Sequence, residues 1–222
     1  MRVLYRDEAV IVIDKPAGLP VHAGPGGDPS LEDGLDALKF GRRERPALAH
    51  RLDRDTSGCL ALARRRRALR RLGELFAAGQ VDKTYWAVVV GTPPAEAGRI
   101  ELALRKQVRK EGWRMVPDAA GQPAITDWRL LGRGRGISWL ELKPRTGRTH
   151  QVRAHCAALG CPVLGDRIYG ATAAGLAAGT PLHLHARAIR LPYAEGGAPV
   201  AAEAPVPAHM LKALRSCGFA GD

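Results

Sequence analysis

Asparagine is absent from this chain of 222 residues, and aromatic residues make up only 5% of it. No apolar run approaches the roughly 20 residues that a membrane-spanning helix needs, so we expect no membrane partner. The first residues, MRVLYRDEAVIVIDKP, lack the apolar core of a signal peptide, which favours a cytoplasmic protein. The four cysteines form no CxxC pair and do not follow a zinc-ligand rhythm with the histidines, so we expect reduced structural thiols.

Acidic residues are few in relation to basic ones. The chain has 22 acidic and 34 basic residues, a net charge of +12, and only seven of the basic residues are lysines. Basic side chains that neutralise phosphates release condensed counterions, so this excess favours a polyanionic partner such as nucleic acid. Compositional drift towards arginine is the alternative. Hydrophobic residues at 45% and charged residues at 25% are ordinary for a globular protein. The length fits one large domain or two packed lobes, and we expect a single domain over residues 1–222.

Strand patterns outnumber helix patterns and are joined by short gaps. The expected strands are Val10–Asp14, Cys59–Ala63, Thr84–Val90, Ile100–Leu104, Ile125–Leu131, Ile137–Leu142 and Leu182–Arg190. The expected helices are Leu31–Phe40 with Ser30 as N-cap, Arg64–Ala78, Thr149–Leu159 and Ala208–Ser216. This order predicts an α+β fold with a mixed, mainly antiparallel central sheet and flanking helices. The glycine cluster Gly132–Gly136 indicates a hairpin loop, with an RGG-type RNA box as the less favoured alternative.

A polar segment, HRLDRDTSG (His50–Gly58), separates an apolar stretch from an expected buried strand. Seven of its nine residues are polar or charged, and loops of that kind carry function more often than packing. A solvated turn, in which Asp55, Thr56 and Ser57 cap one another, explains the residues equally well.

A second segment, Lys83–Ala87, opens the strongest strand pattern. Trp86 is best explained as core filling. Because successive side chains alternate along a strand, Tyr85 should point to the other face, where it can line a cleft.

A third segment, Lys143–Arg153, combines a strand end, a Pro, a Gly and a helix start. We expect Thr149 to cap the helix, and its first N–H groups to form an anion-binding corner with Arg148 and His150. Arg153 lies one helical turn beyond Thr149 and can point into the same cleft. The alternative is that these basic side chains are simply solvated at the surface. A metal pair of His150 and His155 is improbable, because residues five apart do not share a helical face.

Together the three segments resemble the RluA-type family of RNA pseudouridine synthases. The likeness runs from VIVIDKPAG (Val10–Gly18) through HRLDRDTSG and TGRTHQVRAHCAALGCPVLGDRIYG (Thr146–Gly170) to Leu184–Ala186 and about Pro205. The HRLDRDTSG string is highly specific, and its long sequel is nearly as specific. The resemblance implies an isomerase that converts uridines of structured RNA to pseudouridine without metal or cofactor. It also implies two lobes around a catalytic cleft.

The resemblance also implies roles for individual residues. Asp53 matches the catalytic aspartate of the family, and Tyr85 matches the tyrosine that stacks on the target uracil. Arg153 matches the basic residue that ion-pairs with the aspartate. Arg51 matches the arginine that fills the space left by the flipped nucleotide. We further expect contacts to RNA stem-loops, ribosomal or transfer, from Arg51, Arg54, Arg148 and His150. Many relatives carry a small N-terminal RNA-binding domain. We expect this chain to start at the catalytic region and to act as a monomer.

Several features stay open. The stripe Arg64–Arg71 is either a phosphate contact or a solvated helix face. Cys59 follows the polar loop, but a small buried thiol explains it better than redox chemistry. Two rival functions are a non-catalytic RNA-binding or ribosome-associated module, and a metal-dependent nuclease, which would need the clustered carboxylates that the sequence lacks.

Overall fold

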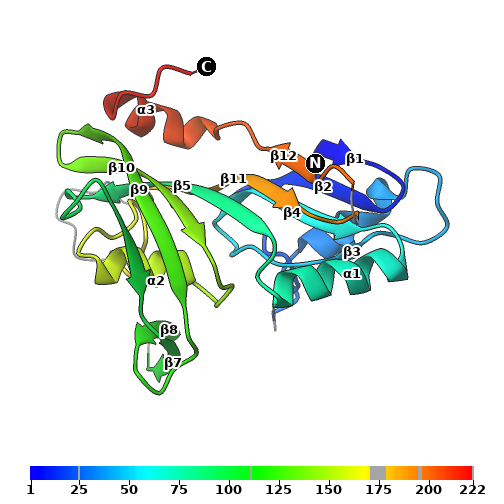
Figure 1. Cartoon of the computed structure of the whole chain (residues 1–222), viewed down its shortest axis with the longest axis horizontal. Helices are drawn as coiled ribbons and strands as arrows, with labels where there is room; N and C mark the ends of the chain where they lie inside the picture. The colour runs from blue at the N-terminus through cyan, green and yellow to red at the C-terminus, as the bar shows by residue number, and fades with distance from the viewer. Residues whose placement is uncertain (25, 111, 171–178, 195–196, 222) are drawn as a thin grey trace. The chain divides into compact units, whose positions relative to one another are not determined.

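The structure is a computed structural model, and it describes residues 1–24, 26–110, 112–170, 179–194 and 197–221 (Figure 1). The fold is of the expected α+β class, with a mixed, mainly antiparallel sheet and a few helices. The chain divides into two compact units, one of Met1–Lys83 with Ala186–Pro205 and the other of Thr84–His185 with Val206–Asp222.

The first unit is built on the strand order β1-β2-β4-β11, with β3 paired to β4 and β12 paired to β11. The strands are β1 (Arg2–Arg6), β2 (Val10–Lys15), β3 (Ala47–Leu48), β4 (Ser57–Ala63), β11 (Leu184–Leu191), whose first two residues belong to the second unit, and β12 (Val200–Glu203). Its helices are the 3-10 helix η1 (Leu31–Leu38) and α1 (Arg66–Ala77).

The core of the first unit lies on both faces of β2 and β4. Val10 and Val12 pack with Leu72 and Leu75 of α1, while Ile11 and Ile13 point to the other face and are also fully buried. Since both faces of β2 are covered, its sequence is a continuous apolar run rather than an alternating one. Burial on both sides holds the ends of β2 and β4 firmly, and one of these ends carries the loop that contains Asp53.

The second unit has the strand order β5-β10-β9-β6 and a separate hairpin of β7 with β8. These strands are β5 (Asp82–Val90), which begins in the first unit, β6 (Ala97–Glu101), β7 (Leu104–Arg109), β8 (Gly112–Pro117), β9 (Ile125–Gly134) and β10 (Ile137–Pro144). The helices α2 (Gln151–Ala158) and α3 (Ala208–Ser216) cover opposite faces of β5. Ala87 and Val89 pack with residues of α2, whereas Val88 packs with residues of α3.

Two expected elements differ clearly from the observed ones, and some observed strands were not expected. The segment Leu31–Phe40 forms a 3-10 helix that ends at Leu38, in which the Asp33 carboxylate accepts hydrogen bonds from the backbone and hydroxyl of Ser30. The strand expected at Ile100–Leu104 is interrupted, because β6 ends at Glu101 and β7 begins at Leu104. The short β12 and the β7–β8 hairpin were not expected at all.

The glycine cluster forms a hairpin, as expected. Strand β9 continues to Gly134, which pairs with Ile137, so Arg135 and Gly136 form the turn. A Cβ atom on Gly132 would lie 1.9 Å from the backbone oxygen of Cys217, at the end of α3. This glycine therefore permits close helix-to-strand packing, which favours the structural explanation of the cluster over an RGG box.

Gly58, the last residue of the polar loop segment, is predicted to tolerate no side chain. Its φ is +109°, and a Cβ atom would lie 2.3 Å from the backbone oxygen of Ala186. We expect Gly58→Ala to lower the free energy of unfolding by about 3 kcal/mol or more, measured by denaturant titration. Gly73→Ala is the matched control, because Gly73 lies inside α1 with open space around it. That change should stabilise the protein by about 0.5–1 kcal/mol. Equal effects of the two substitutions would contradict this explanation.

Candidate active site

The ammonium group of Lys15 organises the loop that carries Asp53. Lys15 ends the apolar strand β2 and is fully buried, with 0% of its surface exposed. Its Nζ donates hydrogen bonds to the backbone oxygens of Pro16 at 2.7 Å, Leu19 at 2.8 Å and Arg54 at 3.0 Å. Three carbonyls satisfy the three donors of an ammonium group, so the buried charge is fully hydrogen-bonded. The lysine thereby joins two loops that lie 39 residues apart in the sequence.

The carboxylates of the loop act on the charge of Lys15. Burial lowers the pKa of Lys15 to about 8, and the nearby Asp55 and Asp53 act in the opposite direction. At neutral pH the ammonium group is therefore still charged, and it places a positive charge near the half-buried Asp53. Sequence reasoning missed Lys15, although a lysine soon after the apolar run Val10–Ile13 was a usable signal.

Backbone hydrogen bonds close the same loop. The N–H of Gly18 donates to the Arg54 oxygen at 2.9 Å, and the Arg54 Nε donates to the Gly18 oxygen at 3.2 Å. The N–H of Thr56 donates to the Asp53 oxygen at 3.2 Å. Arg51 and Arg54 both lie exposed on either side of Asp53. The first unit thus carries its three expected site residues on one loop, with Arg51 and Arg54 exposed and Asp53 half-buried.

His50 at the start of the segment is a structural residue. Its Nε2 accepts a hydrogen bond from the Ala61 N–H at 2.9 Å, and its ring stacks on Phe76 at a centroid distance of 4.5 Å. Burial, with a smaller effect of the Lys83 charge, lowers the pKa of His50 to about 3. The ring is therefore neutral at physiological pH, as its role as an acceptor requires.

In the second unit, Tyr85 and Trp86 point to opposite faces of β5, as expected. Trp86 makes edge-to-face contacts with Trp139 at 4.7 Å and Phe219 at 5.7 Å, which confirms that it fills the core. Tyr85 is half-buried and packs against the cluster on the other face, next to α2. Its role in stacking on a base stays a prediction.

The turn before α2 is held by a buried glutamine rather than by the expected cap. The helix begins at Gln151, and its N-cap is His150 with a left-handed φ of 51°, not Thr149. The Gln151 Oε1 accepts from the Thr146 hydroxyl at 2.7 Å and from the Arg148 N–H at 3.0 Å. Its Nε2 donates to the Ile125 oxygen at 2.9 Å and to the Thr126 hydroxyl at 3.0 Å. Gln151 is only 3% exposed, so this fully bonded amide fixes the turn in place of a capping hydroxyl.

Arg148 and His150 have defined positions beside this turn. The Arg148 Nε donates to the Pro123 oxygen at 3.1 Å. The His150 ring stacks on Trp113 of β8 at 4.8 Å, and its Nδ1 lies 3.2 Å from the Tyr169 hydroxyl. Trp113 is 40% exposed, and the Lys106 ammonium lies 4.8 Å from the centre of its ring. This mixture of exposed ring and cations suits contact with nucleic acid.

Arg153 is held by a carboxylate that sequence reasoning did not single out. Its Nε and Nη2 donate to the two carboxylate oxygens of Asp166 at 2.7 and 2.8 Å, and both residues are buried. The Asp166 Oδ1 also accepts from the N–H groups of Ile168 and Tyr169. The Tyr169 ring centre lies 5.3 Å from the guanidinium carbon. A bidentate pair of this kind fixes the plane of the guanidinium group. The pairing of Arg153 with Asp53 stays a prediction.

Other polar residues near these segments have structural roles. His155 is buried, with its two ring nitrogens 2.9 Å from the Thr126 hydroxyl and 3.1 Å from the Leu102 oxygen. All four cysteines are buried and unpaired, and burial raises the pKa of Cys59 to about 12, which argues against a reactive thiol. Within the described residues, no His, Cys, Asp or Glu side chains gather in a group that could hold a metal ion.

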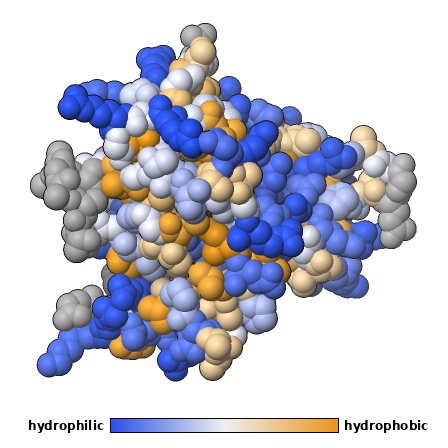
Figure 2. Space-filling view, turned by 60° about the vertical axis from the view of Figure 1, so that its left-hand side comes forward, coloured by the Kyte–Doolittle hydropathy of each residue, from blue (hydrophilic) through white to orange (hydrophobic). Residues whose placement is uncertain are grey.

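The surface is consistent with a polar environment. On the face shown in Figure 2, hydrophilic residues predominate and hydrophobic ones lie among them. Over the described part of the chain, no helix is both long and apolar enough to cross a membrane.

Comparisons with known proteins agree with one another. The family model described as RNA pseudouridylate synthase matches residues 9–158. An uncharacterized RNA pseudouridine synthase of Zymomonas mobilis is 45% identical over 98% of this chain and 97% of its own length. The mitochondrial pseudouridylate synthase RPUSD4 of Xenopus tropicalis is 34% identical over 96% of this chain and 79% of its own. The solved structure of human RNA pseudouridylate synthase domain containing 4 superimposes with a TM-score of 0.80 at 30% identity, covering 97% of this chain and 92% of that one.

The buried pair of Arg153 and Asp166 generates a prediction about stability. Asp166→Asn removes the charge that compensates a buried guanidinium, so it should lower the free energy of unfolding by about 3 kcal/mol. The double variant Arg153→Met/Asp166→Leu removes both charges and should cost less than the single one. Denaturant titrations of the three proteins measure the difference. A cost below about 1 kcal/mol for Asp166→Asn would show that the pair does not hold Arg153.

Proposed function

Since the chain belongs to the RNA pseudouridylate synthase family and is an isomerase acting on uridine in RNA, we propose that Asp53 is its catalytic carboxylate. The observation that carries this proposal is the construction of the Asp53 loop. A buried lysine and several backbone hydrogen bonds hold the loop in one shape, while Asp53 itself is only half-buried. A rigid frame around an accessible carboxylate is what a catalytic group needs.

The reaction explains why a carboxylate is required. Uracil must be detached from the ribose, rotated and rejoined through carbon. A carboxylate can attack the sugar or the base, or it can remove a sugar proton beside the glycosidic bond. In each of these routes the carboxylate must keep a fixed direction, which the hydrogen bonds of Lys15 to the loop carbonyls help to maintain.

We extend the proposal to the other expected residues. Arg153, oriented by Asp166, would hold the carboxylate in the direction of the reacting atoms, and Tyr85 would stack on the extruded uracil. Extrusion of a base costs a few kcal/mol, and the exposed Arg51 could offset it by filling the vacated space. Arg54, Arg148 and His150 would contact the backbone of the RNA.

The substrate proposed is a stem-loop of ribosomal or transfer RNA. The net charge of +12 supports a polyanion, and the exposed Trp113 beside Lys106 supports contact with unpaired bases. We propose that the enzyme acts as a monomer in the cytoplasm, in keeping with four unpaired, buried thiols that suit a reducing compartment.

Exchange of one carboxylate tests the catalytic assignment. Asp53→Asn keeps the size of the side chain, so RNA binding should persist while pseudouridine formation falls by at least about 1,000-fold. Asp55→Asn is the matched control, because this carboxylate lies two residues away, is exposed and also acts on Lys15. The control should stay within about threefold of the wild type.

The measurement is single-turnover conversion of bulk cellular RNA in the presence of EDTA, with chemical detection of pseudouridine. Measurable turnover of Asp53→Asn at a rate similar to Asp55→Asn would refute the role of Asp53.

A further inference from the structure

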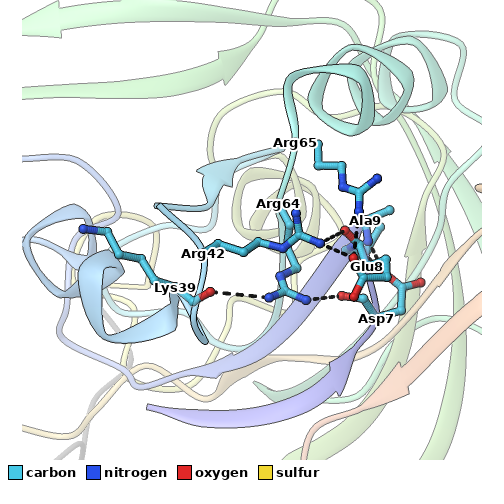
Figure 3. A network of polar contacts seen from close by, with 8 residues as sticks. Asp7, Glu8, Ala9, Lys39, Arg42, Arg64 and Arg65 are labelled. Carbon is cyan, nitrogen blue, oxygen red and sulfur yellow. Dashed lines mark hydrogen bonds and ion pairs between the residues drawn. The ribbon is translucent and has the colours of Figure 1, made fainter. Parts of the chain in front are cut away.

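Four arginines gather in the first unit at a place that the proposed chemistry does not use. Arg6 ends β1, Arg42 follows η1, and Arg64 and Arg65 connect β4 to α1. We call these four residues the distal arginine cluster; Figure 3 shows three of them around Asp7 and Glu8. Arg42 and Arg65 both donate to the Glu8 carboxylate, the second at 2.7 Å. Arg64 donates to the backbone oxygens of Asp7 and Lys39.

Negative charge in the cluster falls short of the positive charge. The Asp7 carboxylate is occupied by the N–H groups of Ala9 and Val10 and by the Tyr5 hydroxyl. Among the residues that the structure describes, Glu8 is therefore the one carboxylate that forms ion pairs with Arg42 and Arg65, and its side chain is 78% exposed. Burial lowers the pKa of Arg64, and repulsion from Arg42 and Arg6 adds to this effect.

Stability does not explain this concentration of charge. Exposed ion pairs contribute only about 0–1 kcal/mol, so the Glu8 contacts are weak. The first turn of α1 continues the row with the exposed Arg66 and Arg67 and has no acidic residue. Cations at the start of a helix are unfavourable, because the helix dipole places partial positive charge there. The arrangement therefore costs helix stability and calls for an external anion.

The cluster lies at the opposite end of the β2–β4 pair from Asp53. Strand β4 starts after the catalytic loop and ends before Arg64, and the antiparallel register pairs Val10 with Ala63 and Lys15 with Gly58. Seven strand residues span about 20 Å, so one uridine at Asp53 cannot also reach the cluster. A longer structured RNA can.

We propose that the distal arginine cluster binds the phosphodiester backbone of the substrate RNA, about 20 Å from the target uridine. The inference rests on the proposed function only in taking structured RNA as the partner. Two guanidinium groups hold the Glu8 carboxylate as they would hold a phosphate, and a phosphate can displace this exposed side chain at little cost. The cluster then sets affinity for the stem of the RNA and leaves the chemical step unchanged.

The test compares two double variants on two RNA hairpins. The loop sequence of both hairpins is the site at which the enzyme forms pseudouridine in bulk cellular RNA, as mapped beforehand. One hairpin has a stem of about 4 base pairs and the other a stem of about 12. The first stem is shorter than the distance from Asp53 to the cluster, and the second is longer. The test variant is Arg42→Gln/Arg65→Gln. The control is Arg129→Gln/Arg133→Gln on β9, whose exposed arginines also pair with glutamates and whose change in net charge is the same.

On the long hairpin, the test variant should bind about tenfold more weakly or worse at physiological salt, and its salt slope should fall by about two. The affinity of the test variant for the short hairpin should equal that of the wild type. Its single-turnover rate at saturating RNA should also be unchanged. Glu8→Gln, which frees both arginines, should tighten binding of the long hairpin only.

Equal weakening by the control would show a general charge effect and overturn the proposal. Unchanged affinity of the test variant for the long hairpin would also overturn the proposal. It would indicate that the cluster binds another partner, such as an acidic protein. Affinity is measured apart from turnover. If the wild type forms no pseudouridine, the proposed function is contradicted; the same two stems are then closed by a uridine-rich loop, and the comparison of affinities still tests the cluster.

Discussion

The ammonium group of Lys15 lies without access to solvent between two loops, and its three hydrogen bonds reach the carbonyls of Pro16, Leu19 and Arg54. A buried cation is tolerated only when its donors are all satisfied, so the two loops must keep the shape that supplies these carbonyls. That requirement fixes the backbone on both sides of Asp53. The Asp53 loop can therefore be rich in charged side chains and still be rigid, because the buried Lys15 holds its backbone.

Several features could be predicted from the sequence because they follow local rules. The alternation of Tyr85 and Trp86 across β5 needs only the period of a strand, and α3 matches its expected range of Ala208–Ser216. The α+β class followed from the order of short strands and helices. Family motifs placed the site segments, which local rules alone left open between a functional loop and a solvated turn.

Other features depend on contacts between distant residues, which no local pattern encodes. Gln151 holds its turn by reaching Ile125 and Thr126, so the helix starts one residue later than a hydroxyl cap at Thr149 would suggest. Asp166 binds Arg153 across 13 residues, and the acidic residue in GDRIYG gave no sign of that partner. The stripe at Arg64–Arg71 divides in the same way: Arg64 and Arg65 meet the β1–β2 turn, whereas Arg66, Arg67 and Arg70 stay exposed.

Hydrogen exchange in Lys15→Met tests most directly whether this lysine holds the Asp53 loop. The Gly18 and Thr56 amides donate to the carbonyls of Arg54 and Asp53, and both should lose protection by at least about 100-fold in the variant. The amide of Ala61, a residue of β4, donates to the His50 ring; it should keep its protection and serves as the internal reference. Unchanged protection at Gly18 and Thr56 would show that the loop keeps its shape without the buried charge, and would contradict the central role given to Lys15.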